Sequence, residues 1–247
     1  MEDVLAVYQR PYDPRYPQVC LDEIQKELRT TPRGDLALEP GQFRREDYEY
    51  GRHGKSSLFL AIEPLVGFRQ VWVRERRTKL DCAYVLRDLV DVIYPEAERI
   101  ILVADNLNIH HPSALYECFP PAEARRIAEK IEWHYTPVHA SWLNVAECEL
   151  SVLRRQCLKR RLPDIDTVQT EVAAWVQQVH DKNEPHGPSI KSMPSTYKEI
   201  AANAALVLIG VSVSLLDRQI AAQAKAFEEE GGFTERLYRT RKNKRRD

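Results

Sequence analysis

One short apolar segment that ends in polar side chains constrains the fold of this chain more than any other feature. Residues 100–104 read Ile-Ile-Leu-Val-Ala, and Asp105 and Asn106 follow directly. A short apolar run bounded by polar residues is typical of a buried strand. Asp105 is then either a turn residue that closes the strand or a metal-binding carboxylate at the strand's end. Both interpretations place a buried strand, and therefore a sheet covered by helices, within the fold.

The rest of the chain predicts further strands and helices in an order that suits a mixed sheet. Strands are expected over 18–22, 56–65, 68–76, 100–105 and 131–137, and helices over 78–95, 120–131, 144–161 and 165–182. Three early strands followed by alternating helices and strands indicate a mixed sheet with helices on its faces. The proline-rich start up to Pro17 is expected to be extended, and residues 29–55 to form a loop or an irregular hairpin. Thr78 is the expected N-cap of the first helix, and Asp166 or Thr167 that of the last.

Composition limits the class of protein. The 247 residues suit one large domain or one domain with an appendage, and the net charge of −1 gives no overall attraction to nucleic acid or membrane. Five cysteines without CxxC spacing argue against a disulfide framework and a structural zinc site, so a reducing, intracellular compartment is expected. No signal segment is visible, and the longest apolar stretch, residues 205–216, is too short to span a bilayer, so no membrane association is expected.

The composition changes after residue 183. Residues 184–194 contain prolines, serines and a glycine, as is typical of a linker, and residues 195–247 are mostly helical by pattern before a basic tail. That tail either binds nucleic acid or only keeps the end of the chain soluble. We therefore expect one domain at 1–183, a linker at 184–194 and a helical C-terminal segment at 195–247.

Two aspartates are candidates for chemistry because each ends a predicted strand. Ligands of an α/β sheet gather outside the carboxyl ends of its parallel strands, so Asp22 and Asp105 share a crevice if their strands are neighbours. Close carboxylates repel each other, and a divalent cation removes that repulsion. Mg²⁺ prefers such hard oxygen ligands together with substrate phosphates. Two such ions can activate the attacking oxygen and stabilise the leaving oxygen in phosphodiester cleavage.

A third carboxylate is expected on the helix predicted over 144–161. Glu147 and Glu149 both flank the apolar stripe of this helix, and a helical wheel does not separate them. Either one is otherwise a solvated helix position. The histidines at 110, 111 and 139 suggest zinc only weakly, because neither HExxH nor CxxC accompanies them.

Basic residues gather in two places. Arg154, Arg155, Lys159, Arg160 and Arg161 lie near the end of the predicted helix, where cations either stabilise the helix C-terminus or neutralise DNA phosphates. A second cluster, formed by Arg74, Arg76, Arg77 and Lys79, either contacts phosphates as well or is only a charged strand edge. Asn106 is either a turn residue or a group that fixes a carboxylate or a DNA phosphate, and Trp142 is expected to pack rather than to stack on a base.

Several blocks of the sequence resemble the DDE transposases of bacterial insertion sequences related to the mariner superfamily. The resemblance runs over about residues 4–183 and is carried by VCLDE at 19–23, DNLNIHH at 105–111 and HYTPVHASWLNVAE at 134–147. It implies a ribonuclease-H-like catalytic core, an α/β fold with a mixed five-stranded sheet, which agrees with the predicted element order. The C-terminal segment resembles instead the helical suffix of small bacterial four-helix-bundle proteins.

The resemblance also implies roles for individual residues. Its catalytic, metal-binding triad maps onto Asp22, Asp105 and Glu147, which chooses Glu147 over Glu149, and implies two Mg²⁺ or Mn²⁺ ions. Water would cut the phosphodiester at the element's end, and the freed 3′-hydroxyl would attack target DNA. Supporting or DNA-binding roles are expected for Asn106, His110, His139, Asn144, Arg154, Arg155, Lys159, Arg160 and Arg161. The implied partners are double-stranded DNA and a second copy of the chain, in the bacterial cytoplasm at the nucleoid.

Two departures from the family pattern bear on function. Few residues precede Asp22, whereas the family carries helix-turn-helix DNA-binding domains there. Recognition of the element's ends is therefore expected either to come from a separate helix-turn-helix chain or to be lost. The family's usual closing segment is also missing after about residue 183. A fusion across a broken reading frame explains both ends. The alternatives to an active transposase are an inactive remnant that only associates with DNA and a ribonuclease-H-like host nuclease.

Overall fold

The computed structural model describes residues 1–32, 48–138 and 140–182. The strands in these ranges are β1 (Gln18–Thr30), β2 (Gly51–Glu63), β3 (Phe68–Arg74), β4 (Ile100–Ala104) and β5 (Ile131–Tyr135). The helices are α1 (Glu2–Tyr8), α2 (Lys79–Asp88), α3 (Ser113–Cys118), α4 (Pro121–Glu129), α5 (Val145–Gln156) and α6 (Ile165–Lys182), with short turns η1 (Leu89–Ile93), η2 (Asn108–His110) and η3 (Ser141–Leu143). The predicted linker, the helical C-terminal segment, its basic tail and His139 lie outside the described residues.

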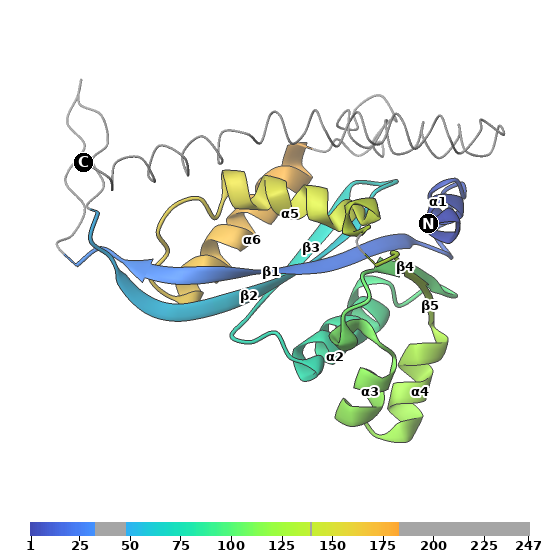
Figure 1. Ribbon diagram of the computed structural model, residues 1–247. Coiled ribbons are helices and arrows are strands. Elements are labelled where there is room, and N and C mark those ends of the chain that lie inside the picture. The colour runs from blue at the N-terminus through green and yellow to red at the C-terminus, as the bar shows by residue number, and fades with distance from the viewer. Residues whose placement is uncertain (33–47, 139, 183–247) are drawn as a thin grey trace, which may run out of the picture. The chain divides into compact units, whose positions relative to one another are not determined.

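The described strands form one mixed sheet in the order β3-β2-β1-β4-β5 (Figure 1). The β3–β2 and β2–β1 pairs are antiparallel, whereas β1–β4 and β4–β5 are parallel. This arrangement confirms the mixed five-stranded sheet predicted from the element order. It also makes β1 the strand at which the antiparallel and parallel halves of the sheet meet.

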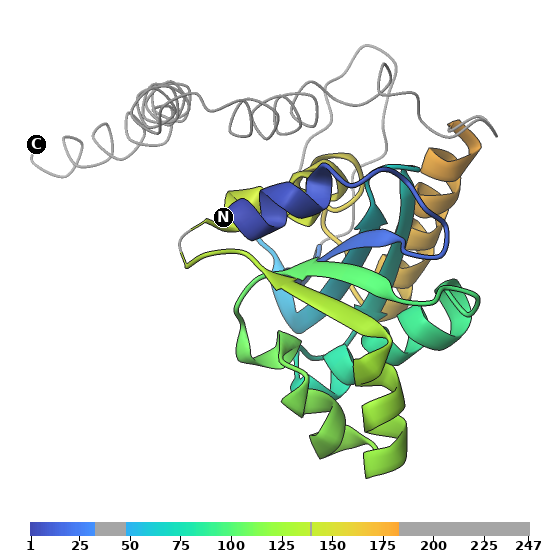
Figure 2. The same cartoon turned by 90° about the vertical axis from the view of Figure 1, so that its right-hand side faces the viewer.

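Helices cover both faces of this sheet. In Figures 1 and 2, α2, α3 and α4 lie on one face, and α5 and α6 lie on the other. The main apolar core fills the first face, where Leu21, Phe59 and Leu102 from the sheet pack with Leu86 of α2 and Ile127 of α4. Because side chains alternate along a strand, the neighbours of these core residues point toward α5 and α6. No helix in the described ranges is long and apolar enough to cross a membrane.

The predicted end of the first strand, residue 22, is wrong, because β1 continues to Thr30. Beyond Asp22, β1 still pairs with β2, from Ile24 beside Leu58 to Thr30 beside Gly51, where β4 no longer accompanies it. Most of its side chains there are partly exposed and polar, so the apolar pattern that reveals a buried strand is lost.

Several helix predictions also need correction. The start of the chain is not extended: α1 precedes the prolines and buries Val4, Leu5 and Val7. The helix α3 was not predicted, and the helix expected over 144–161 ends at Gln156. Thr78 is confirmed as the N-cap of α2, in a capping box with Asp81.

The last helix, α6, is capped by a residue that the sequence pattern did not suggest. Asp164, rather than Asp166 or Thr167, accepts a hydrogen bond from the Thr167 backbone at 2.7 Å. Asp164 lies three residues before Thr167, as an N-cap requires.

Candidate active site

The parallel pairing of β1 with β4 brings Asp22 and Asp105 to neighbouring positions. Cys20 lies beside Val103, and the same offset places Asp22 beside Asp105, the first residue after β4. Neighbouring strands lie about 4.7–4.9 Å apart, so the two side chains start from adjacent backbone positions. The sequence analysis predicted that Asp22 ends its strand, but Asp22 lies in the interior of β1. The two aspartates therefore lie side by side where β4 stops and β1 continues.

Asp22 lies among other carboxylates. It is 8% exposed, and its Oδ1 accepts a hydrogen bond from the Glu23 backbone N–H at 2.7 Å. Burial raises the pKa of Asp22 to about 7, and the charges of Glu23, Asp105 and Glu147 add to this rise against the effect of that hydrogen bond. Acidic side chains from β1, the end of β4 and the start of α5 therefore all contribute negative charge at Asp22.

The structure separates Glu147 from Glu149, which the helical wheel did not. Glu149 is 2% exposed, and its carboxylate accepts hydrogen bonds from Arg69 Nε at 2.5 Å and Arg69 Nη2 at 3.3 Å. Arg69 belongs to β3, so this pair joins α5 to the edge of the sheet. Glu147 lies in the first turn of α5, is partly exposed and raises the pKa of Asp22 through its charge. Glu149 is thus engaged in a buried ion pair, whereas Glu147 is the acidic side chain of α5 that acts on Asp22.

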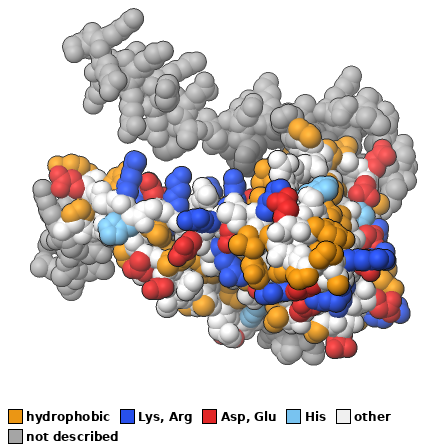
Figure 3. Space-filling view, turned by 90° about the horizontal axis from the view of Figure 1, so that it is seen from below, with side chains coloured by type: hydrophobic (Ala, Val, Ile, Leu, Met, Phe, Trp, Pro, Cys, Tyr) orange, Lys and Arg blue, Asp and Glu red, His pale blue; other side chains and the backbone are white. Residues whose placement is uncertain are grey.

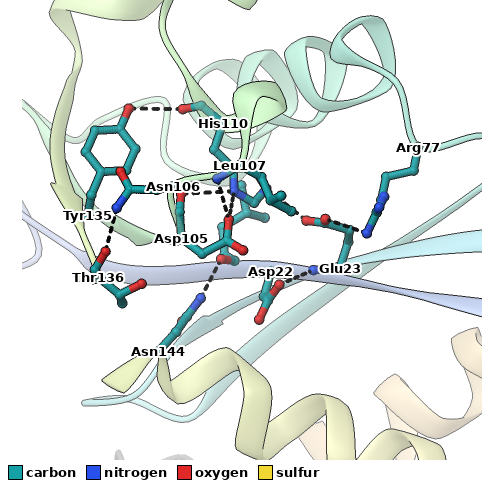
Figure 4. Close-up of polar contacts among 11 residues, drawn as sticks. Asp22, Glu23, Arg77, Asp105, Asn106, Leu107, His110, Tyr135, Thr136 and Asn144 are labelled. Atoms are coloured by element: carbon teal, nitrogen blue, oxygen red, sulfur yellow. Dashed lines mark hydrogen bonds and ion pairs between the residues drawn. The ribbon is translucent and has the colours of Figure 1, made fainter. Parts of the chain in front are cut away.

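Asn144 positions the start of α5 against β1. It is fully buried and caps α5, with Oδ1 accepting a hydrogen bond from the Ala146 backbone N–H at 3.1 Å. Its Nδ2 donates to the Leu21 carbonyl oxygen at 2.9 Å (Figure 4). Leu21 precedes Asp22 and Ala146 precedes Glu147. One amide therefore ties together the two backbone segments that carry Asp22 and Glu147.

Asp105 is held by its neighbours in the turn after β4. Its Oδ1 accepts hydrogen bonds from the Leu107 backbone N–H at 3.1 Å and from His110 Nδ1 at 2.6 Å. Burial alone would raise the pKa of Asp105, but the hydrogen bond and the charge of His110 hold it below its ordinary value. The side chain of Asp105 remains 25% exposed. Asp105 is therefore the ionised and more accessible of the two aspartates.

His110 links Asp105 to a second acid that the sequence analysis did not single out. Its Nε2 lies 2.8 Å from Oε2 of Glu23, whose side chain is 1% exposed. Burial lowers the pKa of His110, but hydrogen bonds to Asp105 and Glu23 outweigh burial and raise it to about 10. The ring is thus an imidazolium at neutral pH and donates from both nitrogens. Arg77 Nη1 approaches the other oxygen of Glu23 at 3.3 Å, so Arg77 is part of the site and not only a charged strand edge.

Figure 4 shows that Asp22 and Glu23 leave β1 on opposite sides. Asp22 points toward the start of α5, and Glu23 points toward His110 and Arg77. This is the alternation expected of adjacent residues in a strand. A signal for Glu23 was present in the sequence, because an acid at an otherwise apolar position of a buried strand needs a partner.

Asn106 connects the turn after β4 to the end of β5. Its Nδ2 donates to the Thr136 carbonyl oxygen at 2.7 Å, and the neighbouring Tyr135 hydroxyl donates to the His110 carbonyl oxygen at 3.1 Å. Asn106 therefore acts as a loop-positioning residue, and its amide N–H is not directed at a carboxylate. Trp142 is 48% exposed, and its expected packing, rather than stacking on a base, stays a prediction.

The basic residues predicted to bind DNA differ in their surroundings. Arg154 and Arg155 lie exposed in the last turn of α5, and Lys159 lies exposed beyond its end. Arg160 pairs with Glu171, and Arg161 donates to the Glu49 carbonyl oxygen at 3.0 Å and lies near the Tyr50 ring. On the face that carries α2–α4, acidic and basic side chains are interspersed (Figure 3). His139 lies outside the described residues.

The donor set suits a divalent cation. Within the described ranges, no three Asp, Glu, His or Cys side chains group closely enough to enclose an ion by themselves. Mg²⁺ commonly takes one or two carboxylates and completes its shell with water and substrate phosphates. Asp22 and Asp105, at adjacent positions of neighbouring strands, fit such a pair, and a cation would offset the negative charge that Asp105 and Glu147 place at Asp22.

Comparisons with known proteins place the chain in a family and identify similar folds. A family model described as DDE superfamily endonuclease matches residues 17–169. The Mos1 strand transfer complex is 16% identical, with a TM-score of 0.50, over 81% of this chain and 58% of that chain. The mariner Mos1 paired end complex with Mg is 19% identical, with a TM-score of 0.49, over 81% and 59%. No curated protein matches the sequence.

The likeness to the Mos1 strand transfer complex concerns the fold. It confirms the ribonuclease-H-like, mixed five-stranded architecture that the sequence predicted. The chain covers 58% of the Mos1 chain and so spans less than two thirds of that protein's length.

Proposed function

Because the chain belongs to the DDE superfamily endonucleases, we propose that it is a DNA transposase catalytic domain that cuts and joins DNA with the help of divalent cations. The arrangement that supports this proposal is the adjacency of Asp22 and Asp105 on neighbouring parallel strands, together with the charge of Glu147, which also acts on Asp22. The tie that Asn144 makes between β1 and α5 supports the same assignment.

Asp22 and Asp105 would hold the metal, and Glu147 would complete the site from the α5 side. Two bound Mg²⁺ or Mn²⁺ ions would supply activation of the attacking oxygen and stabilisation of the leaving oxygen. Asp105 would bind the cation as an ionised carboxylate, because His110 and the Leu107 N–H favour its charged form. Asp22 has a pKa near 7 in the absence of a cation, so cation binding would displace its proton.

The proposed substrate is double-stranded DNA at the ends of an insertion element and at its target. After hydrolysis frees a 3′-hydroxyl, the same carboxylates would serve its attack on the target strand. A second copy of the chain and a separate helix-turn-helix chain are proposed partners, which would act with it on DNA at the bacterial nucleoid. Exposed Arg154 and Arg155 on α5 are suited to contact phosphates near the proposed metal site.

The test is nicking of supercoiled plasmid by the purified chain in Mn²⁺, Mg²⁺ or EDTA. The wild type is expected to nick with Mn²⁺ or Mg²⁺ only, and Asp105→Asn and Glu147→Gln are expected to abolish nicking. Glu129→Gln, which removes an exposed acid of α4, is the matched control and should nick like the wild type. Equal nicking by Asp105→Asn would overturn the assignment, and salt-sensitive DNA binding without nicking would indicate a non-catalytic remnant.

A further inference from the structure

Glu23, His110 and Asp105 form a chain of hydrogen bonds that runs from the core side of β1 into the proposed metal site. His110 has no exposed surface, and each of its ring nitrogens lies within 2.8 Å of a carboxylate oxygen. The position of the ring is fixed by its own backbone, since the His110 N–H donates to Leu107 and its carbonyl accepts from Tyr135. The imidazole therefore has little freedom to move when Asp105 binds a ligand.

The two carboxylate oxygens of Asp105 have different surroundings, because both described hydrogen bonds to this carboxylate go to Oδ1. His110 and the Leu107 N–H both bond to Oδ1. Rotation of the carboxylate would leave the buried His110 N–H unpaired, which is costly in a site closed to water. Oδ1 thus fixes the rotamer, and Oδ2 is the oxygen that remains to meet an incoming cation.

We infer that Glu23 and His110 are positioning residues that hold Asp105 in the orientation needed to bind a divalent cation. Glu23 lies on the opposite side of β1 from Asp22, and His110 stands between it and Asp105, so Glu23 is a support and not a further metal ligand (Figure 4). Arg77 donates a hydrogen bond to the second oxygen of Glu23 and so helps to fix the position of the Glu23 carboxylate. This inference rests on the proposed function for the identity of the ligand.

Charge and positioning predict opposite effects of removing His110. A cation beside a metal site disfavours metal binding, so loss of the imidazolium would tighten Mn²⁺ binding if His110 acted only through its charge. If His110 positions Asp105, its loss weakens binding, by about 10–100-fold for a group that orients a metal ligand. The sign of the change therefore separates the two roles.

The experiment measures Mn²⁺ binding to the full chain without DNA, from the loss of the free-ion electron paramagnetic resonance signal. His110→Ala and Glu23→Gln are expected to raise the dissociation constant, by about 10–100-fold for His110→Ala. His110→Asn keeps an N–H donor near the place of Nδ1 and should recover part of the affinity. His111→Ala is the matched control, because His111 is exposed and its side chain bonds only to Ser113 among the contacts described.

Thermal unfolding of the metal-free variants shows whether they are folded. If His110→Ala does not fold, Mn²⁺ binding to His110→Asn still tests the inference. Binding to His110→Ala or His110→Asn that is as tight as in the wild type, while Asp105→Asn loses it, would overturn the inference and leave the proposed function intact. No Mn²⁺ binding by the wild type would overturn the proposed metal site, and the inference with it.

Discussion

At the scale of single residues, the fold places the carboxyl group of Asp22 where its ionised form is disfavoured. Its pKa of about 7 lies above the ordinary value, first because of burial and then because of neighbouring carboxylates. Between about pH 4 and 7, the folded chain therefore binds more protons at Asp22 than the unfolded chain does. The free energy of unfolding must fall as pH rises through this window, when no cation is present.

Replacing Asp22 by Asn removes this dependence on pH. In metal-free buffer, Asp22→Asn should match the wild type near pH 4 and exceed its free energy of unfolding at pH 8, by on the order of 1–3 kcal/mol. Urea unfolding followed by circular dichroism at both pH values measures the difference. Stability profiles of wild type and variant that run parallel from pH 4 to 8 would show that Asp22 is not in an acidic, buried environment.

At the scale of elements, α5 is attached to the sheet by a buried ion pair that lies apart from the proposed chemistry. Glu149 and Arg69 are 3% and 13% exposed at their side chains, and removal of one partner leaves the other charged and buried. Glu149→Ala should therefore lower the free energy of unfolding by roughly 3–5 kcal/mol. Glu147→Gln should change it by no more than about 0.5 kcal/mol, because Glu147 is partly exposed.

Chemical denaturation of both variants tests this division of roles. The double variant Arg69→Met/Glu149→Leu should recover most of the loss, since it leaves no unpaired charge. A large loss of stability in Glu147→Gln together with none in Glu149→Ala would reverse the assignment of the two acids.

The hydrophobic pattern of the sequence predicted some elements accurately and others only in part. β4 was predicted almost to the residue because it is buried along its whole length. β1 was cut short at Asp22 because its outer half pairs with β2 alone and is mostly polar. Helical periodicity alone did not distinguish Glu147 from Glu149, because the residue that separates them, Arg69, lies on a distant strand. Long-range partners of this kind are not visible in local periodicity.

At the scale of the whole molecule, a net charge of −1 requires that DNA be bound by local cations. The double variant Arg154→Ala/Arg155→Ala should weaken DNA binding and lower the slope of log K against log salt by about 2, or about one for each lost phosphate contact. Fluorescence anisotropy at several salt concentrations measures both quantities. Arg125→Ala, on α4 across the sheet, should leave the slope unchanged. An unchanged slope in the double variant would place the DNA elsewhere.

The proposed metal site requires that Asp22 and Asp105 bind the same cation. The most direct test is a crystal of the chain soaked in Mn²⁺, with the ion located by its anomalous scattering. A peak is expected within coordination distance of both carboxylates, on the side of β1 that faces Glu147. A peak bound elsewhere, with Asp22 and Asp105 directed apart, would contradict it.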